Sequence, residues 1–188
     1  MRSQCAFTLT ELIIALVILG VLTALGVPAY TEFVRSGRRS AVLNELVGAL
    51  NLARSEAIKR GVPVALCRTA NGTSCGGAAT WTGGWLVFVN TDGDSPAVVD
   101  AGETVLRVHQ PENPPYTLTP NGPFTNFLAY QANGGTNSTA GRFTYCDARG
   151  LRSARAVIVN TTGRPRLSRD TNGDGVDEDE SGAALVCP

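Results

Sequence analysis

The sequence predicts an α+β protein in which one long N-terminal helix packs on an antiparallel, β-rich globular head. Three observations predict this class. An apolar run lies near the N-terminus, a helical repeat of apolar residues follows it, and the rest of the chain alternates short β-like segments with clusters of Gly, Asn, Pro and Thr. The 188 residues suffice for one compact domain plus a separate helical element.

The apolar run extends from Leu12 to Val27, with Thr23 as its polar interruption. As a helix, residues 7–27 would rise about 30 Å, the thickness of the hydrocarbon core of a bilayer. A cleaved secretory signal is the alternative, but no Ala-x-Ala site follows the run. We therefore expect a short leader, residues 1–6, followed by a transmembrane segment that is retained.

Glu11 lies at the start of this segment, where a carboxylate is costly unless it is paired. The amino group of Phe7 on a neighbouring subunit could supply the opposite charge if helices stacked with an axial offset. Glu11 therefore predicts assembly into a filament. Pro28 predicts a bend, because proline lacks an N–H and its ring clashes with the preceding helical turn.

Residues 28–61 predict an amphipathic continuation of the same helix. Its apolar stripe recurs every three to four positions and consists of Leu43, Leu46, Val47, Leu50, Ala53, Ala57 and Ile58. Gly61 and Pro63 are typical of residues just beyond a helix end. One helix from Phe7 to Arg60 is predicted.

Residues 62–188 predict the β-rich head, arranged most simply as a meander. The predicted strands are Val62–Arg68, Gly84–Asn90, Thr104–His109, Tyr116–Thr119, Phe127–Gln131, Arg142–Asp147 and Ala154–Asn160. The second of them is apolar on both faces and is predicted to be buried. Core packing is favoured for Trp85, although Trp81 and Trp85 could instead stack on nucleic-acid bases.

Four cysteines remain beyond Cys5 of the leader, and an even number in an exported domain suggests two disulfides. Three connectivities can be drawn. We favour Cys67–Cys75, which closes a short loop, and Cys146–Cys187, which holds the C-terminus. A zinc site is the rival, but the chain has no CxxC spacing and one histidine.

The segment Ala6, Phe7-Thr-Leu-Thr-Glu11 and the apolar helix after it resemble the processing motif of type IV prepilins. The resemblance implies that a prepilin peptidase cuts between Ala6 and Phe7 and methylates the new amino terminus. It also implies that Glu11 sets the register of subunits and that Pro28 kinks the helix. Ala6 stands where Gly is usual and Thr10 where Ile is usual, and both are small enough to fit.

Nearly the whole chain resembles the GspH/FimT family, through Asn44–Val64, Gly84–Val89, Gly102–Arg107 and Thr162–Arg166. The resemblance implies a type IV pilin fold and a minor pilin that primes pilus assembly near the tip. The alternative is a minor pseudopilin of type II secretion. Some members of the family bind DNA for natural transformation.

The same resemblance implies the partners and the location of the protein. Other minor and major pilins, the prepilin peptidase, the inner-membrane assembly platform and membrane lipid are the expected partners, with double-stranded DNA as a candidate. The chain would cross the bacterial inner membrane once with a periplasmic head. It would then enter an extracellular pilus or a periplasmic pseudopilus.

Gly163-Arg164-Pro165-Arg166 matches the Gly-Arg-x-Arg motif of the DNA-binding members. By resemblance, Arg164 and Arg166 would contact phosphates, and Arg169 would extend the basic patch. A plain turn between edge strands is the alternative. The six acids of residues 170–180, which follow directly, oppose a polyanion.

Those acids also contain a candidate calcium loop, because oxygen-bearing side chains alternate at Asp170, Asn172 and Asp174, and Val176 would offer its carbonyl. Ser181 occupies the twelfth position, where such loops carry a carboxylate. A solvated acidic loop is the alternative. Asn90 to Asp94 repeats the pattern less well and favours a hairpin turn.

Catalysis finds no support, because no Gly-x-Ser-x-Gly, His-Glu-x-x-His or phosphate-loop pattern occurs. His109 is expected to be a surface or partly buried ring. The predicted protein is not an enzyme and requires no cofactor, with Ca²⁺ as the candidate ion.

Overall fold

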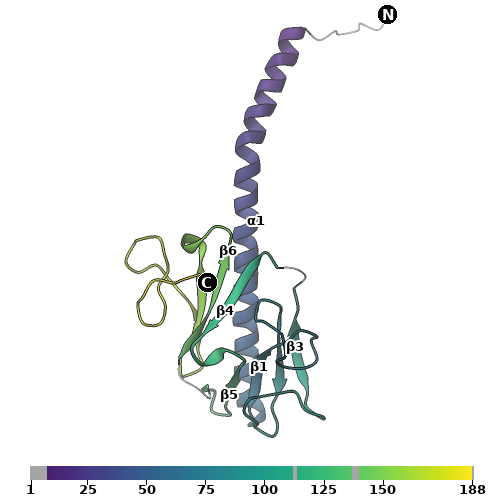
Figure 1. Cartoon of the computed structure of the whole chain (residues 1–188), viewed down its shortest axis with the longest axis vertical. Coiled ribbons are helices and arrows are strands. Elements are labelled where there is room, and N and C mark those ends of the chain that lie inside the picture. The colour runs from purple at the N-terminus through teal and green to yellow at the C-terminus, as the bar shows by residue number, and fades with distance from the viewer. Residues whose placement is uncertain (1–7, 112–113, 137–139, 188) are drawn as a thin grey trace, which may run out of the picture. The chain divides into compact units, whose positions relative to one another are not determined.

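The computed structural model describes residues 8–111, 114–136 and 140–187. The chain divides into two compact units, Met1–Val42 and Leu43–Pro188. Helix α1 (Leu9–Arg60) begins in the first unit and ends in the second (Figure 1). Its predicted end is confirmed, because Gly61 follows with φ 70° and donates its N–H to the carbonyl of Ala57.

In the first unit, α1 exposes its large apolar side chains from Leu9 to Phe33. By length and composition, this helix is able to cross a membrane. The helix runs through Pro28, whose carbonyl accepts a hydrogen bond of 2.8 Å from the Thr31 hydroxyl. The bend expected at Pro28 stays a prediction.

In the second unit, the apolar stripe predicted for α1 is buried. Leu46, Leu50, Ala53 and Ala57 are fully inaccessible to solvent, whereas Ile58 near the end of the helix is half exposed. The helical repeat therefore identified the face that packs on the head.

The first sheet is antiparallel, in the order β3-β2-β1-β5. Its strands are β1 (Val64–Arg68), β2 (Trp85–Val89), β3 (Val105–His109) and β5 (Phe127–Tyr130). Helix α1 contacts both edges of this sheet. Arg107 of β3 pairs with Glu45 at 3.1 Å, and Arg54 Nε donates to the carbonyl of Gly134, just beyond β5, at 2.9 Å. The helix therefore crosses one face of the sheet.

The second sheet is also antiparallel, in the order β4-β6-β7-β8. Its strands are β4 (Tyr116–Asn121), β6 (Gly141–Asp147), β7 (Arg155–Val159) and β8 (Pro165–Leu167), with short 3-10 helices at Gly122–Phe124 and Leu151–Ser153. All seven predicted strands are present, and β8 was not predicted. The predicted meander is wrong, because β5 returns to pair with β1 and β4 opens a second sheet.

Apolar residues fill both faces of the first sheet. Every residue of β2 is buried, as its sequence predicted. Trp85 is fully buried and stacks on His109, with ring centroids 4.0 Å apart. Trp81 is buried as well, and its indole N–H donates to the carbonyl of Thr125 at 3.0 Å. Both tryptophans are thus core residues and are not available for stacking on bases.

His109 is partly buried, as expected, with 22% of its side chain exposed. Its burial against Trp85 lowers the pKa of the imidazole, and the nearby Glu45 carboxylate opposes that shift only in part. The ring therefore packs as a neutral flat surface at the edge of the core.

Two disulfides join Cys67 to Cys75 and Cys146 to Cys187, which is the pairing favoured from the sequence. The second bridge spans 41 positions and fixes the C-terminal segment on the outer face of the second sheet. That face carries a cluster of buried residues: Cys146, Ala154, Ala156, Ile158 and Leu185.

Candidate functional site

The Gly-Arg-x-Arg segment forms the hairpin turn from β7 into the edge strand β8. The carbonyl of Asn160 accepts the N–H of Gly163 at 2.9 Å, and its side-chain oxygen accepts the N–H of Arg164 at 3.0 Å. Arg166 lies within β8, opposite Ile158. Arg164 and Arg166 are both exposed. The segment is therefore a turn into an edge strand, and it also exposes both arginines of the motif.

Gly163 has a steric reason to be glycine. Its φ is 76°, and a Cβ at this position would lie 2.2 Å from the carbonyl oxygen of Gly134 and 2.8 Å from the ring of Tyr130. No side chain can be accommodated there without a shift of the backbone. The turn thus packs tightly against the segment after β5. This packing fixes the backbone from which the arginine side chains project.

Acids neutralise three of the four other arginines between residues 142 and 169, whereas the fourth, Arg152, is exposed. The ion pairs are Arg142–Asp179 at 3.1 Å, Arg142–Glu180 at 2.8 Å, Arg149–Asp147 at 2.7 Å and Arg155–Asp177 at 3.1 Å. Within the described ranges, no acid forms an ion pair with Arg164, Arg166 or Arg169, and all three are exposed. Three acids of the C-terminal block therefore neutralise arginines elsewhere, and they do not cancel the charge of this turn.

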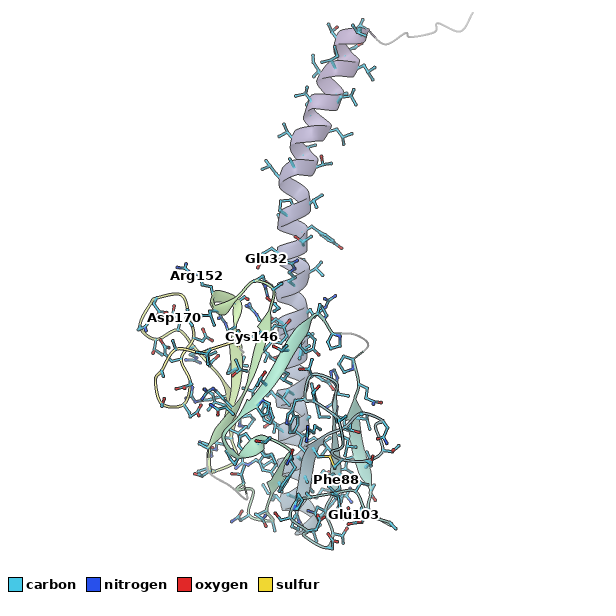
Figure 2. All side chains as sticks on the ribbon, viewed as in Figure 1. Glu32, Phe88, Glu103, Cys146, Arg152 and Asp170 are labelled. Carbon is cyan, nitrogen blue, oxygen red and sulfur yellow. A yellow bond between two sulfur atoms is a disulfide. The ribbon has the colours of Figure 1, made fainter. Side chains whose placement is uncertain are left out.

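The candidate calcium loop begins at Asp170, which is labelled in Figure 2. Asp170 accepts the N–H groups of Gly173 at 2.7 Å and Gly175 at 2.8 Å, and these bonds lower the pKa of its carboxyl. Asp174 accepts the N–H of Val176 at 2.8 Å. One carboxylate oxygen each from Asp170, Asp174 and Glu178 lies within 4.8 Å of the others.

The structure brings Glu178 to this cluster, a ligand position that the sequence pattern did not predict. Counting to the twelfth position of a calcium loop ends at Ser181, whose hydroxyl donates to Asp179 at 2.6 Å. Glu178 is the ninth residue from Asp170, on the same alternating series. Its buried position, with 5% of its surface exposed, depends on tertiary packing that local spacing does not show.

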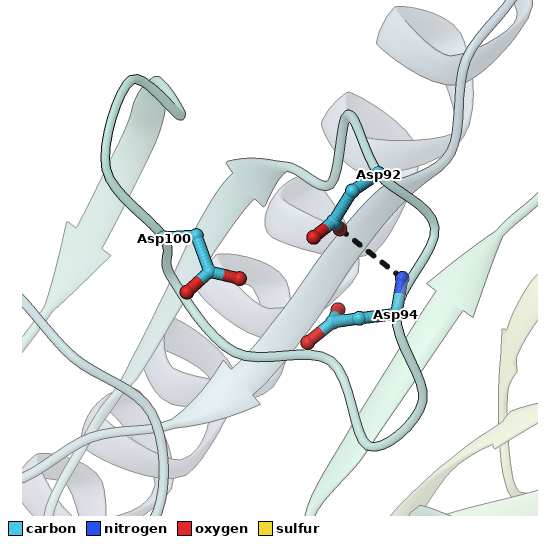
Figure 3. Close-up of side chains that lie close together, drawn as sticks. All are labelled: Asp92, Asp94 and Asp100. Atoms are coloured by element: carbon cyan, nitrogen blue, oxygen red, sulfur yellow. Dashed lines mark hydrogen bonds between the residues drawn. The ribbon is translucent and has the colours of Figure 1, made fainter.

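A second acidic cluster consists of Asp92, Asp94 and Asp100, in the connection from β2 to β3 (Figure 3). Asn90 accepts the N–H of Gly93 at 2.9 Å, and Asp92 accepts that of Asp94 at 3.2 Å, which makes residues 90–94 a turn, as expected. The three carboxylates are exposed or half-buried. Water can solvate all of them.

Glu11 forms a capping box at the start of α1. Its Oε2 accepts the backbone N–H and the hydroxyl of Thr8, each at 2.9 Å, and Thr8 Oγ1 accepts the N–H of Glu11 at 3.3 Å. Glu11 thus caps the first turn of the helix, a local role that was not predicted although Thr-x-x-Glu is the sequence signature of a capping box. Ala6 and Phe7, the predicted cleavage position, lie outside the described residues.

An N-terminal prepilin motif, one long helix and a β-rich head define the class of type IV pilins. Residues 1–27 match the family model described as prokaryotic N-terminal methylation motif. Residues 42–163 match the model described as type II transport protein GspH. The chain belongs to the GspH family, which is a family of structural proteins rather than enzymes.

Individual relatives agree with this assignment. The chain is 34% identical to fimbrial protein Q of Moraxella bovis over 84 residues, which are 45% of this chain and 53% of that protein. The chain thus spans about half the length of that curated relative. It also resembles two crystal forms of the type IV minor pilin FimU of Pseudomonas aeruginosa. The TM-scores are 0.54 and 0.50, at 20% identity over 73% and 69% of this chain and 92% of each FimU chain, which shows a shared fold.

Proposed function

We propose that the protein is a minor pilin of a type IV pilus, where its head presents the turn from Gly163 to Arg169 to double-stranded DNA. One observation carries the DNA proposal: Arg164, Arg166 and Arg169, in and beside the edge strand β8, are exposed and unpaired among the described acids, while Arg142, Arg149 and Arg155 are neutralised. Exposed guanidinium groups on a rigid turn suit phosphate oxygens.

Assembly would proceed through the N-terminal segment. A prepilin peptidase would cut between Ala6 and Phe7 and methylate Phe7, and α1 would hold the subunit in the inner membrane until other minor and major pilins and the assembly platform take it up. The methylation-motif match and the exposed apolar surface of residues 9–33 support this role. The head would remain in the periplasm before it reaches the pilus.

A minor pseudopilin of type II secretion is the second candidate, and the description of the GspH family as type II transport proteins supports it. The names of the relatives, a fimbrial protein and a minor pilin, favour the pilus. Deletion of the gene distinguishes the two. Loss of surface pili supports the proposal, whereas loss of secreted proteins with normal pili supports the pseudopilin.

DNA binding is tested by titrating full-length protein in detergent with a short duplex at several salt concentrations. We expect a Kd of about 10⁻⁴ to 10⁻⁶ M and a log–log salt slope that reports the number of phosphate contacts. Arg164→Ala and Arg166→Ala should each weaken binding and reduce the slope by about 1.

Lys59→Ala is the matched control, because it removes one positive charge from an exposed side chain of α1 in the same unit of the structure. Its slope should equal that of the wild type. If the control weakens binding as much as the two arginine variants, or if no variant weakens it, the turn is not a DNA site.

A further inference from the structure

The acids of residues 170–180 fall into two groups of three. Asp177, Asp179 and Glu180 form ion pairs with Arg155 and Arg142. Asp170, Asp174 and Glu178 form no ion pair with a described residue and instead gather their oxygens within 4.8 Å of one another. Three carboxylates at this separation repel each other, so a cation among them would be strongly stabilising.

The loop that holds this cluster is anchored at both ends. The N–H of Glu178 donates to the carbonyl of Arg169 at 3.0 Å and closes the neck of the loop. Next to the neck, Asp177 is buried, accepts the Ser168 hydroxyl at 2.6 Å and pairs with Arg155 at 3.1 Å. The carboxylates therefore project from a fixed frame rather than from a free tail.

Glu178 supplies an independent sign of a ligand site. Only 5% of its surface is exposed, and its Oε2 accepts the N–H of Thr171 at 2.7 Å and the Thr171 hydroxyl at 2.9 Å. Its Oε1 is also buried, yet it accepts no hydrogen bond from any residue in the described part of the chain. A buried carboxylate oxygen without a partner is costly, unlike the two oxygens of Asp177, which both have partners.

We propose that this loop binds one Ca²⁺ through Asp170, Asp174 and Glu178. Calcium bonds of about 2.3–2.6 Å place ligands on opposite sides of the ion about 4.6–5.2 Å apart, so three oxygens within 4.8 Å of one another fit one ion. The side-chain oxygen of Asn172 and the carbonyl of Val176, on the same alternating positions, would complete an all-oxygen shell. Ser181, at the twelfth position, has no carboxylate to complete the calcium shell, and Glu178 would supply that carboxylate instead.

The choice of ion follows from the ligands. The ligand set consists of oxygens and contains no His or Cys, the ligands that zinc and copper prefer, so it does not favour either of these ions. Ca²⁺ accepts six to eight oxygens in a flexible geometry, whereas Mg²⁺ requires a near-ideal octahedron at about 2.0–2.1 Å. An irregular loop with one buried and two exposed carboxylates matches the calcium requirement.

The test is calorimetric titration of chelator-stripped full-length protein with CaCl₂, and with MgCl₂ in parallel. We expect one Ca²⁺ per chain with a Kd of about 10⁻⁴ to 10⁻³ M, as in extracellular calcium modules, and weaker Mg²⁺ binding. At ten times the Kd, Ca²⁺ should raise the Tm of the head by about 3–5 °C, and EDTA should reverse the rise.

Two variants and one control locate the ion. Glu178→Gln keeps the shape of the buried side chain. Asp174→Asn alters an exposed side chain and keeps an oxygen that can accept the N–H of Val176. Each variant should weaken Ca²⁺ binding at least about tenfold. Asp94→Asn, in the cluster of Figure 3, should leave binding unchanged. Absence of binding by wild-type protein, unchanged binding by the two loop variants, or loss of binding in Asp94→Asn each overturns the proposal.

Discussion

Arg142, near the start of strand β6, and Asp179, in the C-terminal segment, form a buried ion pair with Nη1 and Oδ2 3.1 Å apart. Each side chain is 9% exposed, and Glu180 approaches the same Nη1 at 2.8 Å. The pair joins a β-strand to residues 37 positions later in the sequence (179 − 142 = 37). The ion pair and the Cys146–Cys187 disulfide therefore both attach the C-terminal segment to β6.

Arg142→Met should destabilise the head, because it removes the positive charge and leaves Asp179 buried without it. We expect a loss of about 3 kcal/mol in the free energy of unfolding, measured by urea denaturation of full-length protein. Arg60→Met, which breaks an exposed pair with Glu56, should lose less than about 1 kcal/mol. Equal losses in the two variants would contradict a structural role for the buried pair.

Asp147 should make the protein sensitive to acid. Burial alone would raise its pKa, but hydrogen bonds from Arg149 and Ser153 outweigh burial and lower the pKa from 3.8 to about 2. A carboxyl with a lower pKa in the folded chain stabilises the fold above its unfolded pKa, and the stabilisation is lost as the pH falls through the folded pKa.

The expected loss is about 2 kcal/mol between about pH 4 and about pH 2. Urea denaturation over this range measures it, with Asp147→Asn as the comparison because the variant cannot titrate at that position. The gap in stability between wild type and variant should close as the pH falls. A gap that stays constant would show that Asp147 does not cause the acid sensitivity.

Gly163→Ala should be more harmful than an ordinary glycine substitution at positive φ. Gly61 has a similar φ of 70°, but no atom lies within 4 Å of the place that a Cβ would occupy, so Gly61→Ala should cost about 1 kcal/mol. At Gly163 the Cβ would also meet the carbonyl of Gly134, which adds about 1–3 kcal/mol. Thermal unfolding of both variants gives the comparison, and similar Tm values would show that the close approach does not matter.

Local patterns predicted most of this fold. The end of α1, its buried stripe and seven strands follow from the spacing of apolar residues and from glycine and proline signals, which act over a few residues. Strand β8 escaped prediction because it is three residues long, begins with a proline and has an exposed arginine at its centre. The pairing of β1 with β5 escaped because it joins segments about sixty residues apart, where no local signal exists.

Charge was harder to predict than hydrophobicity. In the sequence, the arginines and acids of the C-terminal region form two opposed blocks, whereas the fold interleaves them, so that Arg142 and Arg155 lie against Asp179 and Asp177. Which charged side chains stay without an ion pair, such as Arg164 among the bases and Glu178 among the acids, is decided by the tertiary fold. A candidate site can therefore be suggested from sequence, but its net charge requires the fold.

Glu11 provides the last prediction, because the structure gives it a capping role and the sequence suggests an assembly role. Glu11→Gln separates the two. Gln can cap the helix as Glu does, but it cannot pair with the ammonium group of Phe7 on a neighbouring subunit. If the charge sets the register, Glu11→Gln should lower incorporation into sheared pili at least about tenfold, the effect of losing about 1.4 kcal/mol.

Thr8→Val is the matched control, since it removes the hydroxyl from the capping box and keeps the carboxylate. It should weaken the first helical turn by about 1 kcal/mol and leave incorporation near the wild-type level. Immunoblots of sheared pili and of membranes from a complemented deletion strain measure both pools of the subunit. The opposite pattern, with normal incorporation of Glu11→Gln and poor incorporation of Thr8→Val, would mean that Glu11 serves the helix end and that other contacts set the register of the filament.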